Sequence, residues 1–177
     1  TKCAIHDGQY DFSKEHILKS VKGSIQRLGV EYVDCLLLHR PDTLMEPEEV
    51  AEAFDILESE GLVRHFGVSN HNPMQMELLK TAVKQPLIIN QLQFSVTEAG
   101  MITAGMNVNM KNTESVMHDG GLLEYSRIKG ITIQTWSPFQ YGFFEGNYVD
   151  NPDFPELNEK LAEMAEKYAL TKTGVAA

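Results

Sequence analysis

Short apolar runs alternate along this chain with longer segments in which apolar residues recur at helical spacing. Runs of the first kind are typical of buried β-strands, and segments of the second kind are typical of amphipathic helices. Five apolar runs end in a polar residue that a buried strand does not need for packing. They cover residues 1–2, 36–39, 66–70, 87–91 and 131–137. Because helices separate them, the strands should run parallel and share one face at their carboxyl ends, in an α/β fold.

Capping and breaking residues set the ends of the expected helices. Ser13 can cap the first helix through its side-chain hydroxyl, and Gly29 ends that helix. Pro47 suits the start of a second helix, and a third begins at Asn72. Residues 95–121 should form a loop, which is long for a connection between a strand and a helix. The remaining expected helices cover residues 122–128, 155–168 and 170–177.

Length and composition are those of one globular domain. The 177 residues suffice for a sizeable core, and no linker or low-complexity tract interrupts them. A net charge of −10 argues against nucleic-acid binding, which needs a basic face. No stretch approaches the roughly 20 apolar residues of a membrane span. Cys3 and Cys35 lie inside apolar strands, which favours two buried reduced thiols over a disulfide and fits a cytoplasmic location best.

Four motifs follow the strands in a fixed order. They are Leu36-Leu37-Leu38-His39-Arg40-Pro41-Asp42, Gly61-Leu62-Val63-Arg64-His65-Phe66-Gly67-Val68-Ser69-Asn70, Asn90-Gln91 and Trp136-Ser137-Pro138. In this order and at this spacing they resemble the aldo/keto reductase superfamily over essentially the whole chain. Within that superfamily the chain is most similar to bacterial oxidoreductases with a long loop after the sixth barrel strand.

The resemblance implies a (β/α)₈ TIM barrel and an NADP(H)-dependent enzyme that reduces aldehydes or ketones to alcohols without a metal. NAD(H) is possible as well, because the preference comes from the family and not from residues of this chain. A closed barrel typically has about 250 residues, so we expect about strands 3–7, in one partial domain over residues 1–177 that is truncated at both ends. The family's catalytic Tyr and Asp would precede Thr1, and its adenosine-phosphate site would follow Ala177. The isolated fragment should therefore be inactive or nearly so.

Two residues match catalytic positions of the family. Lys2, at the end of a strand, would lie beside the Tyr phenol and favour its phenolate form. His39 would donate a hydrogen bond to the substrate carbonyl oxygen and polarise it. The plainer alternatives are a solvated lysine and a core histidine satisfied by backbone groups. The strand end before Cys3 and Ala4, together with the match to the family, favours the catalytic role of Lys2, and the Arg40-Pro41-Asp42 run that follows His39 favours the catalytic role of His39.

Further residues match positions that hold the cofactor in the family. They are Ser69, Asn70, Gln91, Trp136, Ser137, Phe139 and Gly142. The first three would bind the nicotinamide carboxamide, which needs both donors and acceptors. Trp136 would stack against the nicotinamide ring, although core filling is its plainer role. The last three would follow the cofactor pyrophosphate, where a glycine lets backbone amides approach.

Two other functions compete with this hypothesis. The same fold serves as a cofactor-binding regulatory module in ion-channel β subunits, but the presence of both Lys2 and His39 favours an enzyme. A metallohydrolase would need a pair of histidines at adjacent strand ends, which the sequence lacks. The other histidines show no metal-ligand spacing and are interpreted as structural: His6, His16, His65, His71 and His118. The expected partner is a small carbonyl compound, with neither nucleic acid nor membrane, and the oligomeric state stays open.

Overall fold

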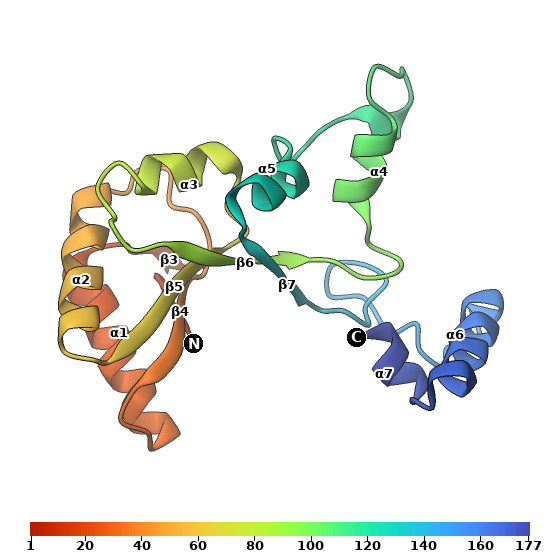
Figure 1. Ribbon diagram of the computed structural model, residues 1–177, viewed down its shortest axis with the longest axis horizontal. Helices are drawn as coiled ribbons and strands as arrows, with labels where there is room; N and C mark the ends of the chain where they lie inside the picture. The colour runs from red at the N-terminus through yellow and green to blue at the C-terminus, as the bar shows by residue number, and fades with distance from the viewer. The chain divides into compact units, whose positions relative to one another are not determined.

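Five strands form the main sheet of the computed structural model, which describes residues 1–177 (Figure 1). In the order in which neighbours pair, they are β1 (Lys2–Cys3), β4 (Val33–Leu38), β5 (Val63–Ser69), β6 (Leu87–Gln93) and β7 (Thr132–Trp136). The pairs β1–β4, β4–β5 and β5–β6 are parallel. All five strands coincide with runs that the apolar pattern predicted, and the α/β prediction is confirmed.

Helices connect the strands, and all but α4 and η1 lie where the sequence predicted a helix. They are α1 (Lys14–Leu28), α2 (Pro47–Ser59), α3 (Pro73–Leu79), α4 (Gly100–Met106), α5 (Leu122–Lys129), α6 (Pro155–Tyr168) and α7 (Lys172–Ala176), with a 3₁₀ helix η1 (Thr113–Ser115). The Ser13 side chain accepts a hydrogen bond from the His16 N–H and so caps α1, which ends at Gly29 in the left-handed conformation. Asn72 and Gln75 form a reciprocal capping box at the start of α3.

Two parts of the chain depart from the prediction. A hairpin of β2 (Ile5–His6) and β3 (Gln9–Tyr10) follows β1, and its turn residues Asp7 and Gly8 both have positive φ, as Asp-Gly hairpin turns do. Strands of two residues show no alternating pattern, so the apolar pattern did not reveal them. Residues 95–121, predicted as a loop, contain α4 and η1. Helix α4 carries two glycines and buries no residue, so its sequence signal is weak.

The chain divides into two compact units. The first comprises Thr1–Gln91 and Met117–Gln134, and the second comprises Leu92–Val116 and Thr135–Ala177. In the first unit α1 contacts β1, and α2 contacts β5. Side chains fully buried in this unit include Ile17, Val21, Leu36, Leu38, Phe54, Leu57 and Phe66. An apolar core therefore holds the strands of this unit together and fixes the positions of the polar residues at their ends.

The second unit is built around a buried tyrosine and a buried amide. Tyr148 is fully buried, and its hydroxyl donates a hydrogen bond to the Pro138 carbonyl oxygen at 2.8 Å. Asn158, in α6, donates from Nδ2 to the carbonyl oxygens of Tyr148 and Phe154 at 2.7 and 2.9 Å. These bonds tie the start of α6 to the segment that follows β7.

Both cysteines are free thiols, as expected, although Cys35 is only partly buried. Burial raises the pKa of Cys3 to about 12, so this side chain remains a thiol at neutral pH. None of the helices is long and apolar enough to cross a membrane.

Gly67 lies in β5, where the neighbouring strands approach closely. A Cβ atom there would lie 2.6 Å from the Ile89 carbonyl oxygen and 2.8 Å from Leu37 Cδ2. We expect Gly67→Ala to lower the free energy of unfolding by about 2 kcal/mol, because overpacking forces its neighbours to shift. Urea denaturation measures the change. Gly100→Ala is the control, since no heavy atom lies within 4 Å of its Cβ position. Equal stability of the two variants would contradict the prediction.

Candidate functional site

Four strands of the first unit place polar residues at one edge of the sheet. Lys2 belongs to β1, His39 follows β4, Ser69 ends β5, and Gln91 lies in β6. Because these strands pair in parallel, their carboxyl ends meet at this edge. The register pairs Ser69 with Gln91, and Lys2 Nζ donates a hydrogen bond to Gln91 Oε1 at 2.9 Å. Lys2 thus links two strands that do not pair with each other.

Asn70 follows β5 directly in the left-handed conformation, with φ 59°, which asparagine tolerates better than most residues. Its backbone N–H donates to the Gln91 carbonyl oxygen at 3.0 Å. Its Nδ2 donates to Ser69 Oγ at 2.9 Å and to the His39 carbonyl oxygen at 3.5 Å. The buried Ser69 hydroxyl in turn donates to the Gln91 carbonyl oxygen at 2.9 Å. These bonds hold Ser69, Asn70 and Gln91 as one polar group.

The Gln91 side chain has both its donor and its acceptor engaged. Oε1 accepts the hydrogen bond from Lys2, and Nε2 donates to Gln134 Oε1 at 2.8 Å. Both bonds lie among exposed atoms, so a ligand can compete for them. A ligand amide offers one acceptor and one donor, which could replace Gln134 Oε1 and Lys2 Nζ as the partners of Gln91. The edge is therefore chemically suited to an amide-bearing ligand.

The charges at this edge favour a neutral imidazole. Burial, followed by the positive charges of Lys2 and Arg40, lowers the pKa of His39. Burial and Arg40 likewise lower the pKa of Lys2. The His39 backbone N–H donates to the Cys3 carbonyl oxygen at 3.0 Å, which fixes the start of this segment. A neutral imidazole keeps one N–H group, so His39 can donate a hydrogen bond to an incoming oxygen.

Two buried polar residues, His71 and Asn90, lie next to this edge and hold the backbone at Ser69 in position. His71 is fully buried, and its Nδ1 shares a hydrogen bond with the Ser69 carbonyl oxygen at 2.9 Å. Asn90, also fully buried, donates from Nδ2 to the His71 carbonyl oxygen at 2.8 Å. The sequence interpretation of His71 as structural agrees with this placement. Neither residue matched a motif role, so only the structure reveals that they position Ser69.

The other sequence-predicted cofactor residues lie in the second unit. Trp136 ends β7 and meets the Phe143 ring edge to face, with centroids 6.0 Å apart. Ser137 follows in the left-handed conformation, with φ 53°, and its carbonyl oxygen accepts the Gln140 N–H. This tight turn redirects the chain immediately after the strand.

The turn continues through Phe139 and Gly142. The Phe139 carbonyl oxygen accepts the Tyr148 N–H at 3.0 Å. A Cβ atom on Gly142 would lie 2.6 Å from Glu145 Cδ, so glycine allows the turn to close on that side chain. The segment therefore presents backbone without side-chain bulk at Gly142.

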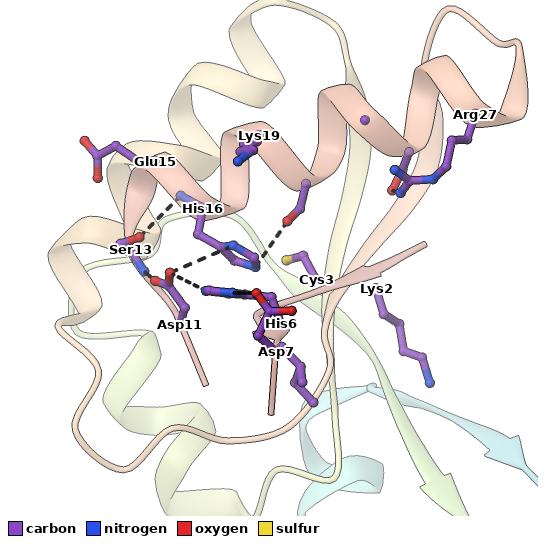
Figure 2. Close-up of a pocket in the computed structure, with 14 residues that line it drawn as sticks. Lys2, Cys3, His6, Asp7, Asp11, Ser13, Glu15, His16, Lys19 and Arg27 are labelled. Carbon is purple, nitrogen blue, oxygen red and sulfur yellow. Dashed lines mark hydrogen bonds and ion pairs between the residues drawn. The ribbon is translucent and has the colours of Figure 1, made fainter. Parts of the chain in front are cut away.

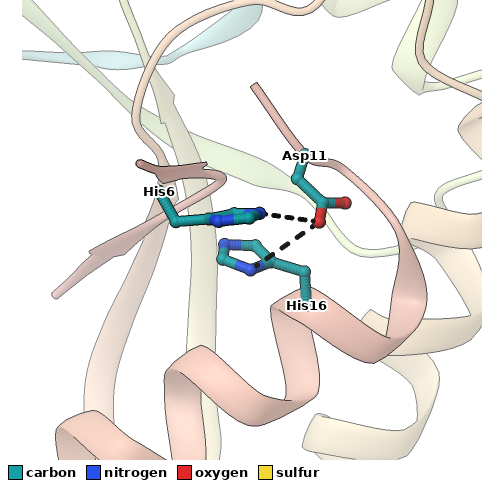
Figure 3. Close-up of side chains that lie close together, drawn as sticks. All are labelled: His6, Asp11 and His16. Carbon is teal, nitrogen blue, oxygen red and sulfur yellow. Dashed lines mark hydrogen bonds and ion pairs between the residues drawn. The ribbon is translucent and has the colours of Figure 1, made fainter. Parts of the chain in front are cut away.

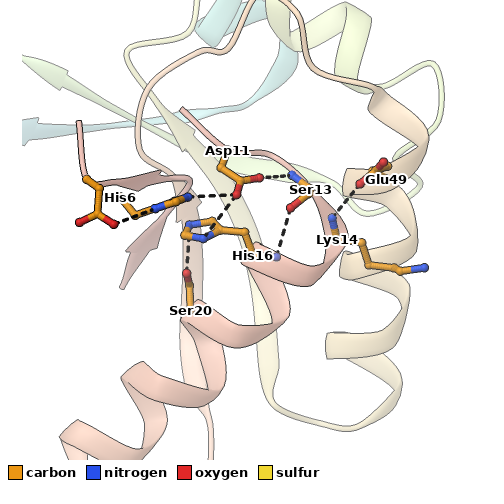
Figure 4. Close-up of polar contacts among 8 residues, drawn as sticks. His6, Asp11, Ser13, Lys14, His16, Ser20 and Glu49 are labelled. Atoms are coloured by element: carbon orange, nitrogen blue, oxygen red, sulfur yellow. Dashed lines mark hydrogen bonds and ion pairs between the residues drawn. The ribbon is translucent and has the colours of Figure 1, made fainter. Parts of the chain in front are cut away.

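A pocket of about 630 Å³ lies between β1, the hairpin and α1 (Figure 2). Lys2 and Cys3 line it at one end, and His6, Asp11 and His16 line it at the other. None of the other residues assigned to catalysis or cofactor binding lines this pocket. The three hairpin-side residues form a polar cluster that continues to Ser13 and Ser20 (Figure 4). Sequence analysis assigned no chemistry to this cluster, because its members belong to no spaced motif.

Comparison with known proteins decides the family. The family model described as Aldo/keto reductase family matches residues 1–177. The chain belongs to the aldo/keto reductase family. Its parallel sheet with alternating helices is accordingly part of the (β/α)₈ TIM barrel of this family, as the sequence motifs predicted.

Several curated relatives of this aldo/keto reductase are oxidoreductases. Oxidoreductase YdhF of Escherichia coli is 42% identical over 161 residues, which is 90% of this chain and 47% of that protein. Uncharacterized oxidoreductase YcsN of Bacillus subtilis is 39% identical over 133 residues, which is 75% of this chain and 39% of that protein. 6-Dehydroglucose reductase of Agrobacterium fabrum is 34% identical over 140 residues, which is 78% of this chain and 42% of that protein. The chain thus spans less than half the length of each of these relatives.

Solved structures share the fold at lower identity. The aldo-keto reductase of Bombyx mori in complex with NADP has a TM-score of 0.62 and 22% identity, covering 93% of this chain and 50% of that chain. The aldo-keto reductase MGS-M4, from a deep-sea metagenome library, has a TM-score of 0.64 and 24% identity, covering 99% of this chain and 53% of that chain.

A putative voltage-gated potassium channel subunit beta of Schizosaccharomyces pombe is 27% identical over 155 residues, which is 86% of this chain and 41% of that protein.

Proposed function

We propose that the protein containing this chain is an oxidoreductase that uses NADP(H) to reduce aldehydes or ketones to alcohols by hydride transfer. The observation that carries the proposal is the shared strand edge, where Lys2, the neutral His39 and the Ser69–Asn70–Gln91 group come together. Family membership and the oxidoreductase relatives support the reaction class. The proposed substrate is a small carbonyl compound, and free thiols fit the cytoplasm as its location.

The polar group at the edge fits the carboxamide of a nicotinamide. The Asn70 amide donates to the Ser69 hydroxyl, which donates to the Gln91 backbone carbonyl oxygen, and the side chains of the three residues supply both donors and acceptors. When bound, the nicotinamide supplies the hydride. Gln91 would exchange its exposed bonds for bonds to the carboxamide, and Ser69 and Asn70 would fix the orientation of the ring. The Bombyx mori aldo-keto reductase that shares this fold is in complex with NADP, which supports a nicotinamide cofactor and agrees with the proposed NADP(H).

His39 and Lys2 carry the proposed chemistry of this chain. The neutral His39 imidazole donates a hydrogen bond to the substrate carbonyl oxygen and polarises the carbonyl group. Lys2 lies beside it and favours the anionic form of the proton donor, a Tyr that the family supplies from outside these residues. The proton then moves from the Tyr phenol to the forming alkoxide, with Lys2 stabilising the phenolate left behind.

In the second unit, we assign the segment from β7 onward to the cofactor as well. Trp136 offers an aromatic face to the nicotinamide, with Phe143 supporting the indole edge. Ser137, Phe139 and Gly142 lie on the tight turn after the strand, where backbone amides can bind the pyrophosphate. We further propose that residues 1–177 act as part of one barrel domain.

Trp136 is the single tryptophan of these 177 residues, and the difference between the wild type and a Trp136→Phe variant isolates its fluorescence. Titration of the full-length protein with NADPH should quench its fluorescence saturably, since a bound nicotinamide is expected at this strand end. NADH should need a higher concentration for the same quenching. A Trp136→Phe variant should lose the signal, while Tyr168→Phe, an exposed aromatic change in α6, should retain it. Unchanged Trp136 emission in folded protein at saturating NADPH would contradict the assignment.

A cofactor-binding regulatory module is the second candidate, favoured by the potassium channel subunit among the relatives. The two functions differ in turnover. NADPH oxidation is measured with and without a panel of aldehydes and ketones. A carbonyl-dependent steady state supports the reductase, whereas tight NADPH binding without turnover on any carbonyl compound would support the module.

A further inference from the structure

Two imidazoles and one carboxylate converge on the hairpin side of the pocket (Figure 3). Asp11 Oδ2 lies 3.1 Å from His6 Nε2 and 3.9 Å from His16 Nδ1. The imidazole rings stack with their centroids 4.6 Å apart and their planes 28° apart. Ligand atoms from the three residues all lie within 4.8 Å of one another. One nitrogen from each ring and one carboxylate oxygen therefore lie close enough together to become ligands of one ion after a small rearrangement.

In each imidazole, the ring nitrogen that does not face Asp11 forms a hydrogen bond with another side chain. His6 Nδ1 lies 3.5 Å from Asp7 Oδ2, and His16 Nε2 lies 3.1 Å from Ser20 Oγ. His6 Nε2 donates a hydrogen bond to Asp11 Oδ2. Binding of a metal ion would displace this proton and leave the lone pairs of His6 Nε2 and His16 Nδ1 available as ligands, with the protons on His6 Nδ1 and His16 Nε2. Metal-binding histidines show this arrangement, in which the second ring nitrogen donates to a carboxylate or another oxygen.

The carboxylate is oriented as well. Asp11 Oδ1 accepts the Ser13 N–H at 2.9 Å, which leaves Oδ2 directed at the imidazoles (Figure 4). Ser13 caps α1, and His16 lies in the first turn of that helix, with its side chain only 13% exposed. Two of the three ligands are therefore positioned by the start of α1, and His6 is positioned by the hairpin.

We propose that His6, Asp11 and His16 bind a divalent transition-metal ion, with Zn²⁺ as the expected occupant. Imidazole and carboxylate ligands suit zinc, whereas Mg²⁺ and Ca²⁺ prefer sites made of oxygen. The three residues supply three tetrahedral positions, and water supplies the fourth. Zinc bonds of about 2.0–2.1 Å place tetrahedral ligands roughly 3.3 Å apart, so the rings need to tilt together from their stacked positions.

The bound ion ties the hairpin to the start of α1. This site lies outside the proposed reductase chemistry, since none of its ligands is assigned to catalysis or cofactor binding. Its role is to stabilise the segment that follows Lys2, because an ion that binds only the folded protein shifts the unfolding equilibrium. The proposal therefore stands or falls independently of the reductase.

Equilibrium dialysis of the chelator-stripped full-length protein against Zn²⁺ tests the site. We expect one ion per chain, with His6→Gln and His16→Gln each weakening binding by at least about tenfold. Asp11→Asn should weaken it similarly, because the amide can still accept the Ser13 N–H but lacks the charge. His118→Gln, which removes an exposed histidine outside the cluster, should bind Zn²⁺ as the wild type does. Circular dichroism confirms that each variant is folded.

Substitution with Co²⁺ identifies the ligands directly. We expect the visible bands of tetrahedral Co²⁺ with nitrogen and oxygen ligands, lost in His6→Gln. A thiolate charge-transfer band would place Cys3, which lines the same pocket, on the metal and would overturn the assignment. Equal Zn²⁺ affinity in the wild type, His6→Gln and His118→Gln would overturn it as well.

Discussion

Replacing His39 with Gln, or Lys2 with Met, is expected to lower kcat/KM for carbonyl reduction by roughly 10²- to 10⁴-fold, the range typical of a positioned acid–base group. His39→Gln removes the neutral imidazole that polarises the carbonyl. Lys2→Met keeps the length of the side chain but removes the ammonium that stabilises the phenolate. Steady-state kinetics with NADPH and a reactive aldehyde measures both effects in the full-length protein.

Controls separate this loss from a general structural effect. NADPH affinity should change little in His39→Gln, since the residues proposed to bind the nicotinamide carboxamide are Ser69, Asn70 and Gln91. His65→Gln alters an exposed histidine in β5 that has no proposed part in catalysis or cofactor binding, so the kinetics of this variant should match those of the wild type. Wild-type kcat/KM in both His39→Gln and Lys2→Met would rule out the catalytic assignment of this edge.

The protein should lose stability in mild acid, because the folded state buries His71 as a neutral imidazole. Burial lowers the pKa of this imidazole from 6.5 to about 4, so the folded protein keeps it neutral while the unfolded chain takes up a proton. The unfolded state therefore binds more protons as the pH falls below 6.5, and the free energy of unfolding decreases until the pH reaches about 4. The full contribution, present above the unfolded pKa, amounts to about 3 kcal/mol.

Urea denaturation at several pH values measures this dependence. In His71→Gln the decline between these two pKa values should be shallower than in the wild type, because the remaining groups titrate in both proteins. The exposed His65→Gln should retain the wild-type slope. Parallel curves for the wild type and His71→Gln would show that the buried imidazole contributes nothing to the acid sensitivity.

Elements with a strong periodic or capping signal were predictable from the sequence. The run Leu36-Leu37-Leu38 predicts a buried strand, and β4 ends at its last residue. Ser13 and Gly29 bound α1 as capping chemistry requires. Parallel strand order then brings Lys2 and His39 to one edge, so the first-unit part of the candidate site follows from strand ends alone.

Other features depend on contacts that no local pattern encodes. The hairpin of β2 and β3 has strands too short to alternate, and α4 has a weak helical sequence. The bond between the Ser69 hydroxyl and the Gln91 carbonyl oxygen arises from strand register, which the sequence does not specify residue by residue. The approach of His6 to His16 requires the hairpin to fold back on α1, so spacing along the chain gave no signal of it.

The most direct test of the reductase is to follow the hydride itself. The full-length protein is incubated with a carbonyl compound and NADPH that carries deuterium at both C4 positions of the nicotinamide, and the alcohol is analysed by mass spectrometry. The proposed reaction predicts one deuterium on the former carbonyl carbon, formed at a rate that falls sharply in His39→Gln. An alcohol without deuterium, or no alcohol from any carbonyl compound tested in folded, cofactor-bound protein, would contradict the proposed function.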